Sequence, residues 1–217
     1  MAFDISLIQQ IREGIQKNDR LMCFSIGATY LQEKYLAEAR GTNDIDFIVV
    51  HKGKISNTKL DNLIIEQMQA LNCQTYSESN NPLRFKTSRN VKVHIYTNKI
   101  GDFEISEGMI KRVDSNHQLS SEDFVFLKLL PGEREKDRSD IAFVLKASPD
   151  FKWEILFLEL KTQLEAYEKK FGVGSTFNKV VEIGYTLEAI RDEHPDLVTQ
   201  KSIDSITHLL NFYNSRP

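Results

Sequence analysis

Two aspartates one residue apart, Asp44 and Asp46, stand directly before an apolar run in this chain of 217 residues. The run 47–50 (FIVV) has the aromatic and β-branched character of a buried strand. Because side chains alternate along a strand, both carboxylates would project from one face. Two acids at the edge of a core repel each other and lose hydration, which costs free energy. A divalent cation with oxygen ligands removes that cost, so the pair predicts an Mg²⁺ site that handles phosphates.

Strands and helices alternate around this acidic pair. The expected strands are 21–26, 44–50, 73–77, 83–87 and 91–97, and the expected helices are 4–18, 29–39 and 57–71. The last of these strands alternates cleanly along its length. Val91, Val93 and Ile95 would face one side, and Lys92, His94 and Tyr96 the other. The first half of the chain therefore predicts a sheet with helices beside it.

From Ser120 onward the hydrophobic spacing is almost entirely helical. The expected helices begin near 121, 136, 150, 176 and 201, and the segment 172–174 (GVG) is expected to be a linker. This segregation predicts an α+β fold in two parts. Residues 1–118 would form the α/β core, and residues 119–217 a helical region packed on it.

Composition limits the class of protein. The formal net charge of −3 gives no global signature of nucleic-acid or membrane binding. Only two cysteines occur, Cys23 and Cys73, which does not suit a disulfide framework. We find no targeting segment and no run of membrane-spanning length. These features predict a cytoplasmic protein with no membrane partner.

A glycine separates the first expected strand from the helix that follows it. Gly27-Ala28 would let a ligand approach the backbone closely, and a helix N-terminus offers free N–H groups to phosphate. Many strand-to-helix turns contain glycine for steric reasons alone, so this feature by itself is weak.

Charged residues in the second half form another candidate group. Lys128 precedes the stretch 132–141 (GEREKDRSDI), in which Asp137 and Asp140 share a helical face. Taken alone, this stretch is best explained as a solvated, salt-bridged helix start.

In combination these features resemble the nucleotidyltransferase superfamily typified by DNA polymerase beta. The matching residues are Ile26-Gly27-Ala28 and, after a spacer, Asp44-Ile45-Asp46-Phe47. The stretch 40–47 (RGTNDIDF), followed by Lys128 and 134–141 (REKDRSDI), is more similar still to the abortive-infection (AbiEii) toxin nucleotidyltransferases and their bacterial relatives. The resemblance covers about residues 20–146, and the helical tail carries no matching motif.

The resemblance implies a nucleotidyltransferase-like mixed sheet and transfer of a nucleoside monophosphate from a nucleoside triphosphate to an RNA or protein acceptor with Mg²⁺. It also implies an antitoxin-like partner. The implied metal ligands are Asp44, Asp46 and His94; the implied nucleotide-binding residues are Gly27, Ala28, Thr29 and Arg40; the implied catalytic residues are Asp44, Asp46, Lys128 and Asp137.

The sequence departs from the family at three places. Ala28 replaces the small residue that often carries a phosphate-binding hydroxyl, with Thr29 next to it as a substitute. The spacer before Asp44 is longer than usual, and His94 occupies the slot of the third carboxylate. Histidine suits softer metals than Mg²⁺. Ala28 and His94 favour an alternative function, a module of this fold that binds a nucleotide or a partner without turnover. In a third interpretation, the acidic pair is a coincidence in an unrelated α+β protein.

Overall fold

A computed structural model describes residues 5–35, 44–77, 82–113, 116–130 and 134–215. The chain forms two compact units. Unit 1 comprises Met1–Ile100 and Glu104–Leu119, and unit 2 comprises Gly101–Phe103 and Ser120–Pro217. The predicted boundary after residue 118 falls next to the main division between the units.

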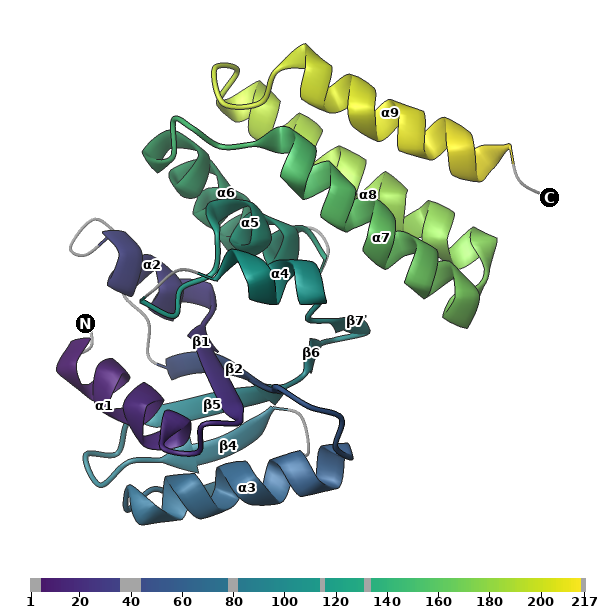
Figure 1. Ribbon diagram of the computed structural model, residues 1–217. Coiled ribbons are helices and arrows are strands. Elements are labelled where there is room, and N and C mark those ends of the chain that lie inside the picture. Colours follow the sequence, from purple (N-terminus) through teal and green to yellow (C-terminus); the bar gives the residue numbers. More distant parts are fainter. Residues whose placement is uncertain (1–4, 36–43, 78–81, 114–115, 131–133, 216–217) are drawn as a thin grey trace. The chain divides into compact units, whose positions relative to one another are not determined.

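Unit 1 is built on a five-stranded mixed sheet with the order β1-β2-β5-β4-β3 (Figure 1). The strands are β1 (Leu21–Ser25), β2 (Asp44–His51), β3 (Gln74–Ser77), β4 (Leu83–Lys86) and β5 (Lys92–Thr97). Strands β2 and β5 pair in parallel, and the other neighbours pair antiparallel. Strands β2 and β5 are distant in sequence, and their pairing brings the polar residues of each to the same part of the sheet.

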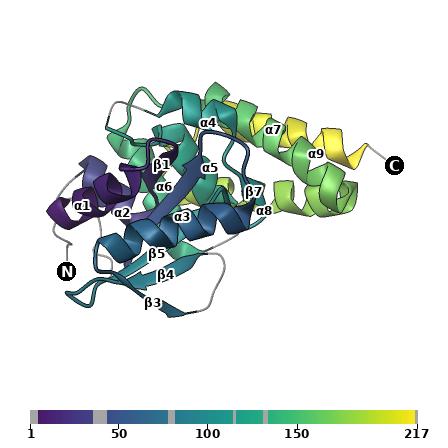
Figure 2. The same cartoon turned by 60° about the horizontal axis from the view of Figure 1, so that its bottom comes forward.

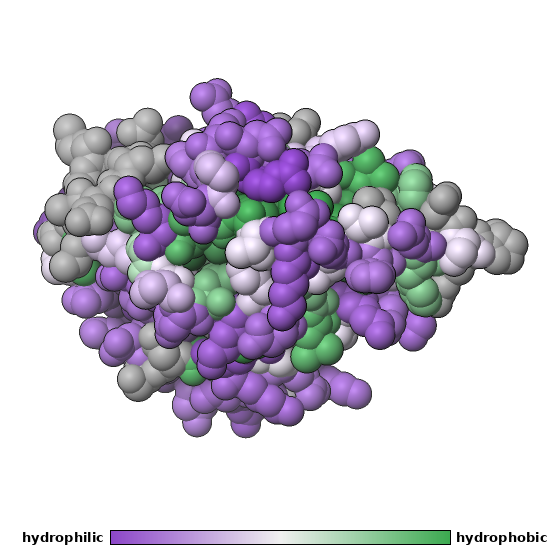
Figure 3. All heavy atoms as spheres, turned by 90° about the horizontal axis from the view of Figure 1, so that it is seen from above, coloured by the Kyte–Doolittle hydropathy of each residue, from purple (hydrophilic) through white to green (hydrophobic). Residues whose placement is uncertain are grey.

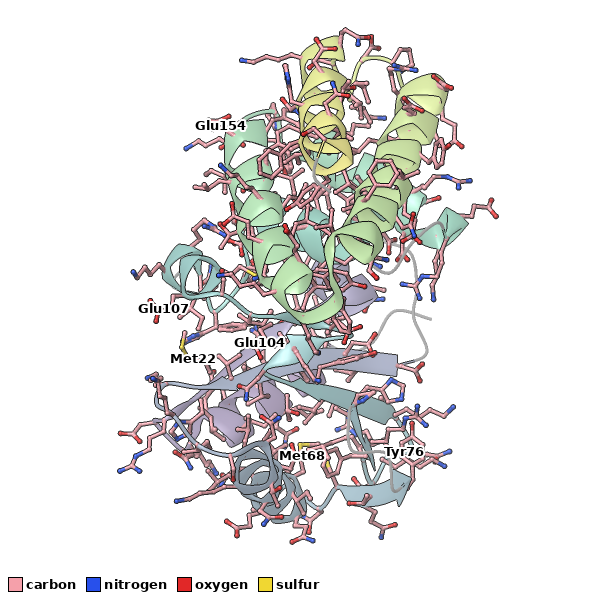
Figure 4. All side chains as sticks on the ribbon, turned by 90° about the vertical axis from the view of Figure 1, so that its right-hand side faces the viewer. Met22, Met68, Tyr76, Glu104, Glu107 and Glu154 are labelled. Atoms are coloured by element: carbon pink, nitrogen blue, oxygen red, sulfur yellow. The ribbon has the colours of Figure 1, made fainter. Side chains whose placement is uncertain are left out.

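Two helices of unit 1, α1 (Ile5–Gln16) and α3 (Asn57–Ala70), bury their apolar sides in the core of this unit. Figure 2 shows α3 lying along the sheet. The alternation of β2 sends Ile45, Phe47 and Val49 into this core. Met68 of α3, labelled in Figure 4, is fully buried there. The hydrophobic effect therefore commits one side of β2 to the core and leaves Asp44 and Asp46 on the other.

The remaining elements of unit 1 are short. Helix α2 (Gly27–Tyr35) follows β1 directly, and α4 (Glu107–Arg112) comes later in the chain. The helix expected over 29–39 begins earlier than predicted, because Gly27 and Ala28 belong to its first turn. The two-residue strands β6 (Lys99–Ile100) and β7 (Phe103–Glu104) form a second sheet.

Unit 2 is helical apart from its share of β7. Its helices are α5 (Ser121–Leu129), α6 (Glu135–Ala147), α7 (Trp153–Phe171), α8 (Val173–Glu193) and α9 (Gln200–Asn214). The expected linker 172–174 is wrong in part, because only Gly172, at a φ of +85°, lies between helices and α8 already begins at Val173. The face shown in Figure 3 is largely hydrophilic, with separate hydrophobic patches.

The molecule is therefore a mixed α/β protein with a mixed sheet and a helical C-terminal region, as the sequence predicted at this coarse level. Within the described ranges, no helix combines the length and apolar character needed to cross a bilayer.

Candidate functional site

Asp44 and Asp46 lie on the same side of β2, as predicted from the alternation of the strand. Both are partly buried, whereas Ile45 between them is fully buried. The acidic pair therefore lies at the edge of the apolar core, where desolvation and mutual repulsion disfavour two neighbouring negative charges.

The N-terminal end of α2 is bound to the backbone of Asp46. The Ile26 N–H donates to the Asp46 carbonyl at 3.0 Å, and the Asp46 N–H donates to the Thr29 hydroxyl at 2.9 Å. Thr29 is fully buried and Ala28 almost so. The structure thus gives Thr29 a defined task, which is to hold the backbone of Asp46. Its predicted contact with phosphate stays a prediction.

Gly27 is required by both its conformation and its surroundings. Its φ of +57° lies in the left-handed region, which glycine adopts without the steric cost of a side chain. A Cβ atom added here would lie 3.3 Å from Oδ2 of Asp46. The glycine therefore keeps the start of α2 close to one carboxylate of the acidic pair.

His94 lies directly beside the acidic pair. The parallel pairing of β2 and β5 sets Asp46 opposite His94, and Nδ1 of His94 is 3.2 Å from Oδ1 of Asp46. The other ring nitrogen, Nε2, is 2.7 Å from the hydroxyl of Tyr76. A continuous chain of contacts thus runs from Asp46 through His94 to Tyr76.

The sequence did not single out Tyr76 or Arg84, two further residues at this site. Tyr76 is partly exposed and belongs to β3 (Figure 4). Burial and the charge of Asp44 raise the pKa of its hydroxyl, and Arg84 lowers it. Arg84 pairs with His94 across β4 and β5. No local motif marks either residue, because only the order of the strands brings them to the site.

The donor atoms suit Mg²⁺ in part. Carboxylate oxygens of Asp44 and Asp46 are the ligands this ion prefers. His94 already contacts the Asp46 carboxylate. Among the described residues, no cluster of three or more His, Cys, Asp or Glu side chains is arranged to hold a metal ion. The two aspartates therefore remain the candidate ligands, and a three-ligand site with His94 stays a prediction.

Lys128 and Asp137 come together inside unit 2. Nζ of Lys128 donates to Oδ1 of Asp137 at 2.8 Å and to Oδ2 of Asp140 at 2.7 Å. All three side chains are buried, and Arg134 also contacts Asp137. The predicted pair is thus part of a larger ionic network. Buried charges require such partners whatever their function, so the network has a structural explanation.

Arg40, the remaining residue predicted to bind nucleotide, lies outside the described residues. The acidic site belongs to unit 1, and the Lys128 network belongs to unit 2.

No protein-family model matches the sequence, and no curated protein matches it either.

Proposed function

We propose that unit 1 is a nucleotidyltransferase-like module that transfers a nucleoside monophosphate from a nucleoside triphosphate to an RNA or protein acceptor. One observation carries the proposal: Gly27, at the first turn of α2, lies against the carboxylate of Asp46. Carboxylates that bind a divalent cation and a helix N-terminus that binds phosphate are the two parts such a site needs. The resemblance of 26–28 and 44–47 to the superfamily supports the same function.

Each residue has a role in this proposal. Asp44 and Asp46 hold the Mg²⁺ ion. When bound, the ion neutralises charge on the phosphates and on the departing pyrophosphate. Gly27 leaves room for the triphosphate beside the N–H groups of α2, and Thr29 fixes the position of Asp46 through its backbone. Arg84 adds positive charge on the strand next to His94.

A second candidate function is nucleotide binding without turnover. The observation in its favour is the contact between His94 and Asp46, which occupies one carboxylate oxygen that a metal ion would otherwise use. In this case the module would act by binding an antitoxin-like or other partner and would not catalyse a reaction.

The experiment combines transfer and binding measurements. The full chain is incubated with Mg²⁺, triphosphates labelled at the α-phosphate, and cell RNA or protein, and calorimetry measures triphosphate binding. We expect labelled product from the wild type and none from Asp46→Asn, which keeps the shape of the side chain. Asp192→Asn is the matched control because Asp192 is exposed on the helical unit.

The possible outcomes separate the two candidates. Binding that depends on Asp46, with no labelled product, supports the binding module. Absence of both binding and product in the wild type would reject both functions.

A further inference from the structure

Unit 1 contains a polar pocket that does not include the acidic pair. Its volume is about 520 Å³, and it is lined by residues of α1, by Glu33 of α2 and by the segment 116–118. All of these belong to unit 1. The volume lies within the usual range for small-molecule sites, roughly 300–1,000 Å³.

Arg12 is a buried residue in the lining of this pocket. It is 7% exposed, it forms an ion pair with Glu33, and Nη2 lies 3.3 Å from the Ser25 hydroxyl. The central carbon of its guanidinium, Cζ, lies over the ring of Phe47, 6.0 Å from the ring centroid. The guanidinium is therefore fixed in place by contacts on several sides.

The donors of Arg12 are not all used. Nε is buried and has no hydrogen-bond partner among the described residues, and Nη1 makes a long contact of 3.5 Å to the Asn116 carbonyl. A buried donor without a good acceptor lowers the stability of the folded state. A ligand oxygen that accepted from Nη1 would improve on this long contact.

The charges and amides of the lining restrict the chemistry of the ligand. Glu13 and Glu33 oppose Arg12, and His117 also lines the pocket; with His117 counted as neutral, the lining has an excess of negative charge that disfavours phosphates. Gln9, Gln16 and Gln118 add side chains that both donate and accept. A suitable ligand is uncharged and carries a carbonyl acceptor next to N–H donors.

We propose that this pocket binds a nucleobase with such an edge, and guanine in particular. Its carbonyl would accept from Arg12, and its ring N–H and exocyclic amine would donate to the glutamates or to the amides. In nucleic-acid recognition, arginine donates to the guanine carbonyl, and carboxylates accept from exocyclic amines of bases. The base could come from a free nucleoside or from the end of an RNA strand, which offer the same edge.

Calorimetry on the full chain, in buffer with EDTA to silence any metal-dependent site, tests the proposal. The probes are guanosine, inosine and adenosine. We expect guanosine to bind at least tenfold more tightly than adenosine, which lacks the carbonyl, with inosine between them. The RNA pentamers UUUUG and UUUUA, used as competitors, distinguish a free nucleoside from an RNA end.

The matched variants are Gln9→Trp and Gln10→Trp, at neighbouring exposed positions of α1. Gln9 lines the pocket and Gln10 does not. The first variant should weaken guanosine binding tenfold or more by filling the pocket, and the second should leave it unchanged. Both keep the buried Arg12–Glu33 pair, so circular dichroism should show an intact fold.

Three results would overturn the proposal. They are no guanosine binding at millimolar concentration, equal binding of adenosine, or equal effects of the two tryptophan variants. None of them bears on the acidic site, which is tested with Mg²⁺ and triphosphates.

Discussion

At the scale of single residues, Gly27 is the position at which substitution should most directly disturb the acidic site. An alanine there would have to adopt a φ of +57° and place its Cβ 3.3 Å from Asp46 Oδ2. Left-handed backbone costs a residue with a side chain about 1–2 kcal/mol. We expect Gly27→Ala to lower the free energy of unfolding by about this amount in urea denaturation, and to weaken triphosphate binding.

Gly174→Ala is the control for this substitution. Gly174 lies within α8 in ordinary helical conformation, and a Cβ there would meet no atom within 4 Å. Because alanine is the better helix former by about 1 kcal/mol, this variant should be neutral or more stable. Equal losses of unfolding free energy in the two variants would show that the left-handed conformation of Gly27 does not cause the loss of stability.

The same residues show how far a sequence can predict this site. Asp44, Asp46 and Gly27 were identified because their signals are local: a pair at a spacing of two, an apolar run, and a glycine at a strand end. Tyr76 and Arg84 were missed because β3 and β4 reach the site only through non-local strand pairing. The partners of Arg12 in the polar pocket are likewise distant in the sequence, and no spacing rule connects them.

At the scale of secondary-structure elements, a side-chain hydroxyl of α2 holds the backbone of β2. Thr29 is fully buried, and its Oγ1 accepts from the Asp46 N–H. Thr29→Val keeps the shape of the side chain but leaves this N–H without its acceptor, which costs about 1–3 kcal/mol. We expect that loss in urea denaturation together with weaker triphosphate binding, because Asp46 loses its support.

The control is Thr162→Val on α7. That threonine is exposed, and its hydroxyl donates to the Leu158 carbonyl within the same helix. A bond of this kind contributes little to stability, so the free energy of unfolding should change by less than about 0.5 kcal/mol. A similar loss of unfolding free energy in both variants would contradict a special role for Thr29.

Helix α3 carries a titratable group whose protonation affects stability. Burial raises the pKa of Asp61 above 3.8, although a hydrogen bond with Thr97 lowers it, and Oδ1 has no partner among the described residues. A raised pKa means that the folded state binds the proton more tightly than the unfolded state. This contribution to stability is present at low pH and is lost as the pH rises from 3.8 through the folded pKa.

Asp61→Asn should remove this dependence, because an amide has the same shape and no charge to bury. We expect the variant to gain stability relative to the wild type as the pH rises above about 4, the ordinary value for an aspartate. Denaturation at a series of pH values measures the difference, with the exposed Asp192→Asn as control. A difference that does not change with pH would contradict the argument.

At the scale of the whole molecule, the two units differ in their secondary structure. The sheet and its acidic face belong to unit 1, and the long helices belong to unit 2. The sequence predicted this segregation because helical and strand periodicities differ over long stretches. The expectation of a solvated helix start around Asp137 was wrong, because Lys128, Asp137 and Asp140 are buried. A buried ionic network suits both a catalytic role and a role in the stability of unit 2.

Lys128→Met distinguishes these two roles. The variant keeps most of the volume of the side chain but leaves Asp137 and Asp140 buried without their shared cation. Breaking a buried ion pair by removing one partner costs about 3–5 kcal/mol. We therefore expect a large loss of stability in the helical unit, measured by the denaturation of the α-helical circular dichroism signal.

Lys170→Met serves as the control, because its ion pair with Asp102 is exposed on both sides and such pairs contribute about 0–1 kcal/mol. A catalytic Lys128 would give the opposite pattern, with normal stability and lost nucleotide transfer. If Lys128→Met unfolds the helical unit, as expected, while Asp46→Asn leaves the stability unchanged, then the role of the ionic network is to stabilise the fold. Nucleotide chemistry would then rest on the residues of unit 1 alone, in which Asp44, Asp46 and Gly27 already lie together.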